Sequence, residues 1–214
     1  MRGLLKNNVY TVWANVKVFA IFMFILGIFV IVVCSQPFQI NYAMIGIVGF
    51  SVNGTAGVKN EYVSKWGKYK LTLPVRRTDI IKSYFVNQII WLLIGTLFIG
   101  TVMGLSWLLH GCPFDQPIDA LTMFALGISV SLFMGAMFFP LFFLGGAERS
   151  DVFWVIALLC ACGIDVVIIT VINELLEPGI TNILFGSFAL ITCSVLFFML
   201  SYFLSAFIFR KKEY

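Results

Sequence analysis

Long apolar stretches alternate with short polar segments along this chain, and none shows the period-two alternation of a membrane β-barrel strand. Spanning a bilayer takes about 20 apolar residues in a helix. A helix also satisfies its own backbone polar groups in lipid. The pattern therefore predicts an all-α, polytopic membrane protein with six transmembrane helices, near residues 18–33, 41–58, 83–107, 120–145, 152–172 and 180–209.

Composition supports this class, because 61% of the residues are hydrophobic and only 11% are charged. A soluble domain has roughly a quarter of its residues charged. The loops are too short for a soluble domain, so residues 1–214 are predicted to form a single transmembrane domain. Residues 18–33 follow a basic lead-in, as a signal peptide would, but no small residues mark a cleavage position, and we expect an uncleaved first helix.

Basic residues are placed asymmetrically, because all 14 Lys and Arg fall on one side of the membrane in this six-helix threading. The loops on the other side, 34–40, 108–119 and 173–179, contain none of them and hold Asp115, Asp119, Glu174 and Glu177. An excess of Lys and Arg marks the cytoplasmic side. Both termini are therefore predicted to be cytoplasmic.

Residues 1–17 are too polar to span a membrane but carry apolar residues at near-helical spacing. They are predicted to form an amphipathic helix on the inner leaflet; a frayed tail is the alternative. Two breaks are also expected. Pro140 and the Gly145-Gly146 pair should kink or end the fourth helix. Residues 173–185 should form either two short helices dipping towards the membrane or a plain loop.

The longest charged stretch, residues 59–82, lies between the second and third spans and is predicted to contain a cytoplasmic helix over 60–73 that Pro74 ends. Helical spacing places one stripe of mostly aromatic residues beside a charged face. The stripe is Tyr62, Trp66, Tyr69 and Leu73, and the charged face is Glu61, Lys65 and Lys68. Two interpretations remain: a helix lying on the inner leaflet, or a docking helix for a cytoplasmic partner.

Small residues four apart occur in the third and fourth spans, at Gly100 and Gly104, and at Gly127, Ser131 and Gly135. Such residues let helix backbones approach closely in lipid. We expect tight helix packing there, including a dimer interface.

Asp165 is the only formal charge well inside a predicted span. An ionisable group in a membrane is costly and suggests function. It is expected either to line a pathway, by binding a cationic substrate group or moving protons, or to face water in an outer vestibule. Asn53 is a second candidate pathway residue; interhelical hydrogen bonding is the default role for it and for Asn87 and Gln88.

Catalytic patterns are missing from the sequence. The single histidine, His110, falls in a predicted outer loop, and no Ser/His, paired-carboxylate or metal-spaced cluster lies in the spans. No G-x-x-x-x-G-K-[ST] run is present to bind ATP. The five cysteines read as small hydrophobic residues. We therefore expect a chain that is not an enzyme and binds no cofactor, metal or nucleic acid.

Segment 59–82 resembles the hallmark of small type-2 ATP-binding-cassette exporter permeases. In that family a Glu, a Trp, a Leu-Pro-(Val)-x-Arg run, an aliphatic pair and a Lys recur between helices two and three. Here they correspond to Glu61, Trp66, Leu73-Pro74-Val75-Arg76-Arg77, Ile80-Ile81 and Lys82. The order of helices along the chain is also similar. Within the family, the chain looks closest to permeases that export antimicrobial peptides or phenol-soluble modulins.

The resemblance implies a dimer, with itself or a paralogous permease, in a bacterial cell membrane. Separate cytoplasmic ABC ATPase subunits would dock on residues 60–73 and supply ATP and Mg²⁺. The implied function is export of hydrophobic or amphipathic cargo, such as peptides or drugs. Two alternatives remain open: a substrate-binding membrane subunit of a vitamin importer, and a stand-alone secondary transporter. The first would leave the charged segment 59–82 without an obvious role. The second would need more ion-coupling residues at mid-membrane than Asp165 alone.

Overall fold

The computed structural model describes all residues except 1, 64–76, 112, 115, 177–178 and 212–214. The described part consists of six long helices and one short 3₁₀ helix. These are α1 (Arg2–Val33), α2 (Gln36–Val63), α4 (Arg77–His110), α5 (Pro117–Gly145), η1 (Ala147–Arg149), α6 (Ser150–Leu175) and α7 (Ile180–Lys211). The all-helical expectation is confirmed for this part of the chain.

The long helices match the predicted spans in order but extend beyond them. The shortest, α6, has 26 residues and is therefore about 39 Å long, which exceeds a hydrocarbon core of about 30 Å. Five of the described helices are long and apolar enough to cross a membrane, and α2 is not among them. Amides and hydroxyls interrupt the apolar residues of α2 along its length. Composition therefore supports five spans, and the sixth stays a prediction.

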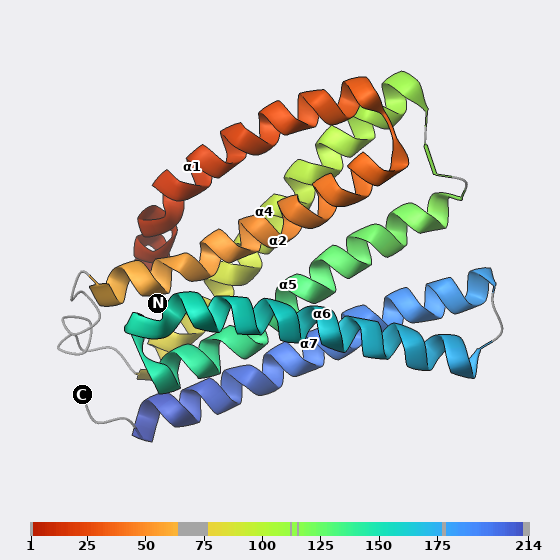
Figure 1. The fold of residues 1–214 in the computed structure, drawn as a ribbon. Coiled ribbons are helices and arrows are strands. Elements are labelled where there is room, and N and C mark those ends of the chain that lie inside the picture. Colours follow the sequence, from red (N-terminus) through yellow and green to blue (C-terminus); the bar gives the residue numbers. More distant parts are fainter. Residues whose placement is uncertain (1, 64–76, 112, 115, 177–178, 212–214) are drawn as a thin grey trace.

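The helices pack as two groups of three (Figure 1). The first group is α1, α2 and α4, and the second is α5, α6 and α7; within each group every helix contacts the other two. Contacts of α2 with α5, and of α4 with both α7 and α5, join the groups. The contact between α4 and α7 brings together segments far apart in sequence.

Helix α5 lies at the centre of the bundle. In its most apolar stretch 78% of residues are buried, against 22–33% for the other four candidate spans. Its C-terminal half supplies a run of fully buried aromatic side chains, Phe138, Phe139, Phe142 and Phe143. The apolar faces that α1, α6 and α7 leave exposed are therefore the surface available to lipid.

One end of the bundle gathers the start of α1, the end of α2, the start of α4, η1 and the end of α7 (Figure 1). We call it the basic end, because each described Lys or Arg lies in the half of its helix nearest to it. The opposite end holds Asp119 and Glu174. The charge separation expected from sequence is thus present in three dimensions among the described residues.

The N-terminal segment differs from the expected surface helix. Residues 2–17 are the first half of α1, which continues to Val33. Leu4, Asn8, Val12 and Val16, spaced four apart, are all buried. They pack inward, with Val12 against Gly57 of α2. Protein, not the leaflet, covers this stripe.

The two expected breaks have different outcomes. Helix α5 continues through Pro140 to Gly145, so the proline does not end it. Gly146 ends it, with φ of +82°, a left-handed conformation that glycine adopts at no steric cost. Between α6 and α7 the described residues fit the plain loop, because α6 reaches Leu175 and residues 180–185 are the first turns of α7.

Candidate functional site

The end of α2 holds a tightly constrained carboxylate at the basic end. Glu61 is only 2% exposed. One carboxylate oxygen accepts a hydrogen bond from the Asn7 amide of α1 at 3.0 Å. The other accepts a bond from the Tyr84 hydroxyl of α4 at 2.6 Å. Hydrogen bonds to a carboxylate are about twice as strong as neutral ones. Glu61 therefore ties together the three helices of the first group.

A second polar pair reinforces this junction. The buried Asn8 amide donates to the Ser83 hydroxyl at 3.0 Å, and that hydroxyl donates to the Ile80 carbonyl at 2.6 Å. Asn8 directly follows Asn7 in sequence, and Ser83 directly precedes Tyr84. We call the set Asn7, Asn8, Glu61, Ser83 and Tyr84 the junction cluster.

The predicted docking helix is only partly described. Residues 60–63 are the last turn of α2, so no new helix begins at Asn60. Glu61 was expected on an exposed charged face, but its carboxylate is bonded to Asn7 and Tyr84 within the junction cluster. Lys65, Trp66, Lys68, Tyr69 and Leu73, together with the side chain of Tyr62, lie outside the described residues. Their docking role stays a prediction.

An ion pair at the basic end joins the two helix groups. The Lys59 ammonium of α2 lies 2.6 Å from one carboxylate oxygen of Asp151, at the start of α6. The Lys59 side chain is 35% exposed and that of Asp151 is 82% exposed. Water screens a pair this exposed, so it sets position more than stability.

The small-residue positions separate into two kinds. A Cβ on Gly127 would lie 2.9 Å from the Ile47 side chain of α2, and a Cβ on Gly135 would collide with the Gln88 amide of α4. Ser131 is fully buried between them. A Cβ on Gly104 would meet no described atom within 4 Å, and one on Gly100 would touch only Phe124, at 4.0 Å. Close packing inside the subunit is present at α5, and a dimer interface at Gly100 and Gly104 stays a prediction.

Polar groups at mid-bundle connect the two helix groups through Gln88. Its amide donates to the Ser131 carbonyl of α5 at 3.0 Å and to the Ser51 hydroxyl of α2 at 3.3 Å. Asn87 donates to the Gly54 carbonyl at 2.8 Å. Both serve the interhelical bonding expected for them. Asn53 instead donates to Gly49 in its own helix at 2.8 Å, and its pathway role stays a prediction.

Asp165 is buried between α5 and α6, with 3% of its surface exposed. The Ser129 hydroxyl lies 3.1 and 3.0 Å from its two oxygens. In this conformation Asp165 therefore does not open on an outer vestibule. No described residues form a group of three or more His, Cys, Asp or Glu able to hold a metal ion.

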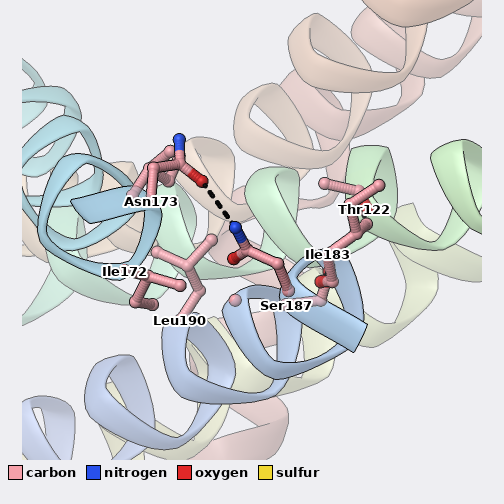
Figure 2. A pocket seen from close by; sticks show the side chains of 9 residues that line it. Thr122, Ile172, Asn173, Ile183, Ser187 and Leu190 are labelled. Carbon is pink, nitrogen blue, oxygen red and sulfur yellow. Dashed lines mark hydrogen bonds between the residues drawn. The ribbon is translucent and has the colours of Figure 1, made fainter. Parts of the chain in front are cut away.

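A small, mostly apolar pocket with four polar side chains in its lining lies at the end opposite the basic one, between α5, α6 and α7 (Figure 2). Its volume is about 130 Å³. Asn182 donates to Asn173 at 3.3 Å across it, and the Thr122 and Ser187 hydroxyls lie 3.2 Å apart. These amides and hydroxyls bond to one another, so the polar groups around the pocket mainly join the three helices at the end away from the basic one.

Sequence reasoning missed the partners of the charged groups. Asn7, Tyr84, Asp151 and Ser129 become visible only when helices meet. A usable signal existed for one residue: Asn8 interrupts the apolar spacing of Leu4, Val12 and Val16, which indicates a buried polar contact.

Comparison with known proteins bears on the class of this bundle. Neither the comparison with curated proteins nor the one with solved structures gave a match. A family model, described as ABC-2 family transporter protein, matches residues 3–210. The match spans all six long helices, the junction cluster and segment 59–82. The chain therefore belongs to the ABC-2 family of transporter membrane proteins.

Proposed function

We propose that this chain is the permease subunit of an ATP-driven exporter in a bacterial cell membrane. It dimerises with itself or a paralogue and moves hydrophobic or amphipathic cargo, such as peptides or drugs, outwards. Family membership supports the permease role, since ABC-2 membrane subunits generally dimerise and work with ATPase subunits. The resemblance to small exporter permeases supports the direction and the cargo.

The basic end supports ATPase docking there. It is cytoplasmic by the positive-inside rule, and segment 59–82 starts in α2 and ends in α4 at this end. The aromatic stripe at Tyr62, Trp66, Tyr69 and Leu73 would fill a cleft on the ATPase. Buried aromatic anchors dominate interface energies, at about 2 kcal/mol or more each. Glu61 belongs to the charged face predicted for the docking helix, but it is buried, so its proposed role is to transmit motion and not to contact the ATPase.

The observation that carries the proposal is the position of Glu61. It lies at the start of the docking segment and binds α1 through Asn7 and α4 through Tyr84. A force applied to residues 62–73 would therefore move α1, α2 and α4 as one group. The Lys59–Asp151 pair would pass part of this motion to α6. Relative movement of the two helix groups is the proposed change of access.

The test is copurification of the full-length chain with its ATPase, together with ATPase activity in proteoliposomes. Trp66→Ala should detach the ATPase and abolish cargo-stimulated hydrolysis, while membrane insertion stays normal. Glu61→Gln should leave the ATPase bound and weaken the coupling, because the carboxylate charge that strengthens both hydrogen bonds is lost. Trp13→Ala is the matched control, since Trp13 is exposed in the same half of the bundle but packs on Trp91 within the subunit.

The proposal would be overturned if Trp66→Ala kept ATPase binding and stimulated hydrolysis and Glu61→Gln kept full coupling. The segment would then be an element of the lipid surface.

A further inference from the structure

A groove between α4 and α7 opens on the membrane side near the basic end. Its volume is about 330 Å³, within the range of ligand pockets at roughly 300–1,000 Å³. Eight residues line it: Lys82, Phe85, Val86 and Ile89 from α4, and Phe198, Met199, Tyr202 and Phe203 from α7. The groove lies where the two helix groups meet, because α4 belongs to the first and α7 to the second.

The floor of the groove is formed by closely packed aromatic rings. Phe85 and Phe198 are 4% and 6% exposed, and their ring centroids lie 4.9 Å apart. Tyr202 packs edge-on against Phe85 at 5.5 Å. The walls are open, because Met199 and Phe203 are 56% and 64% exposed. An extended apolar chain can therefore enter sideways from the bilayer and lie on a preformed surface.

Lys82 gives the groove one charged end. It lies in the second turn of α4, about 10 Å along the helix from Ile89 at 1.5 Å per residue. Its side chain is exposed and, within the part of the chain that the structure describes, forms no hydrogen bond or ion pair. A lysine at this level extends its ammonium to the headgroup region. Tyr202, whose hydroxyl has no hydrogen-bond partner among the described residues, lines the same groove.

We propose that this groove binds one anionic phospholipid from the leaflet at the basic end. An acyl chain lies on Phe85 and Phe198, and the phosphate rests on the Lys82 ammonium. Charge complementarity selects this occupant, since basic pockets between transmembrane helices bind anionic headgroups. A cationic amphipath would meet repulsion at Lys82. A zwitterionic lipid would bring its own cationic group beside the phosphate, which offsets the attraction to the ammonium, whereas an anionic lipid carries no such group. Because the lipid contacts both helix groups, it bridges the elements that move relative to each other in the proposed function.

The test is native mass spectrometry of the delipidated full-length chain, titrated with phosphatidylglycerol or with phosphatidylcholine of identical acyl chains. The first phosphatidylglycerol should bind more tightly than phosphatidylcholine. Lys82→Gln should weaken phosphatidylglycerol binding about fivefold, towards the phosphatidylcholine value. Lys82→Arg should retain the preference. Lys17→Gln is the matched control, since Lys17 is an exposed lysine of the same half of the bundle but lies outside the groove.

A second measurement locates the lipid. Phosphatidylglycerol with a photoreactive acyl chain should cross-link to residues 85–89 of α4 or 198–203 of α7. Equal binding of the two lipids, equal loss in Lys17→Gln, or cross-links elsewhere would overturn the proposal. So would a tightly bound species from membranes that is a peptide or a second copy of the chain. The experiment uses no ATPase, so its outcome is independent of the proposed transport function.

Discussion

At Gly135 the absence of a side chain determines how the two helix groups meet. The Gln88 amide occupies the space a Cβ would need, and from there it donates to Ser131 and Ser51. Removing a polar group from solvent costs little when it is hydrogen-bonded, and much when it is not. One glycine thus permits both the close approach of α4 to α5 and the hydrogen bonds that the buried Gln88 amide nitrogen donates.

Gly135→Leu should destabilise the subunit by about 1–3 kcal/mol, the usual cost of overpacking. It should also displace the Gln88 amide from its partners. The measurement is the unfolding transition of the purified chain in mixed micelles. Gly104→Leu is the control, because a Cβ there meets no described atom within 4 Å. Equal destabilisation by both substitutions would contradict the assignment.

The Gly100→Leu and Gly104→Leu double variant separates packing within the subunit from packing between subunits. It should leave the unfolding transition of the monomer unchanged, because neither added side chain meets a crowded neighbour at its Cβ. Loss of dimer in cross-linking would place α4 at the dimer interface, and an unchanged dimer would show that these glycines are incidental.

At the scale of elements, the basic end is held by two interactions of different strength. The junction cluster, buried except for the half-buried Asn7, joins α1, α2 and α4. The Lys59–Asp151 pair is exposed and joins α2 to α6. A buried hydrogen-bonded carboxylate resists separation, whereas an exposed ion pair breaks and re-forms easily. The first group should therefore move as a unit, and the Lys59–Asp151 contact between the two groups should break when they move apart.

A double-mutant cycle with Lys59→Ala and Asp151→Ala tests whether the ion pair is the weaker of the two interactions. The coupling free energy should lie below about 1 kcal/mol and fall as salt is added, because solvent screens exposed charges. A coupling energy above about 2 kcal/mol, the strength expected of a desolvated pair, would mean that the pair locks the two groups together.

At the scale of the whole molecule, the asymmetric charge predicts that the basic end faces the cytoplasm. Both the start of α1 and the end of α7 lie at the basic end (Figure 1). Cysteine-accessibility mapping in a background without native cysteines checks the orientation. A probe at Gln116 should react from outside, and one at Lys70 only after permeabilisation. The reverse pattern would place the docking segment outside the cell and contradict the proposed function.

The sequence by itself determined the helical class, the order of the helices and the separation of charge. These properties follow from local composition, since a run of about 20 apolar residues is stable in lipid only as a helix. The helix-ending role of Gly146 is equally local, because it depends on one residue's backbone freedom. The family resemblance of residues 59–82 was also readable from the sequence, as the family match over residues 3–210 bears out at the level of the ABC-2 family.

Only the tertiary structure decided which polar groups meet. Helical periodicity places Glu61 on a face but does not say whether water, a partner or another helix covers that face. In the structure Asn7 and Tyr84 cover it, although they lie 54 and 23 residues away along the chain. The same holds for Asp165, whose partner Ser129 belongs to another helix. In lipid the apolar solvent does not distinguish one apolar helix face from another, so packing shape and interhelical hydrogen bonds select the neighbours, and both depend on distant residues.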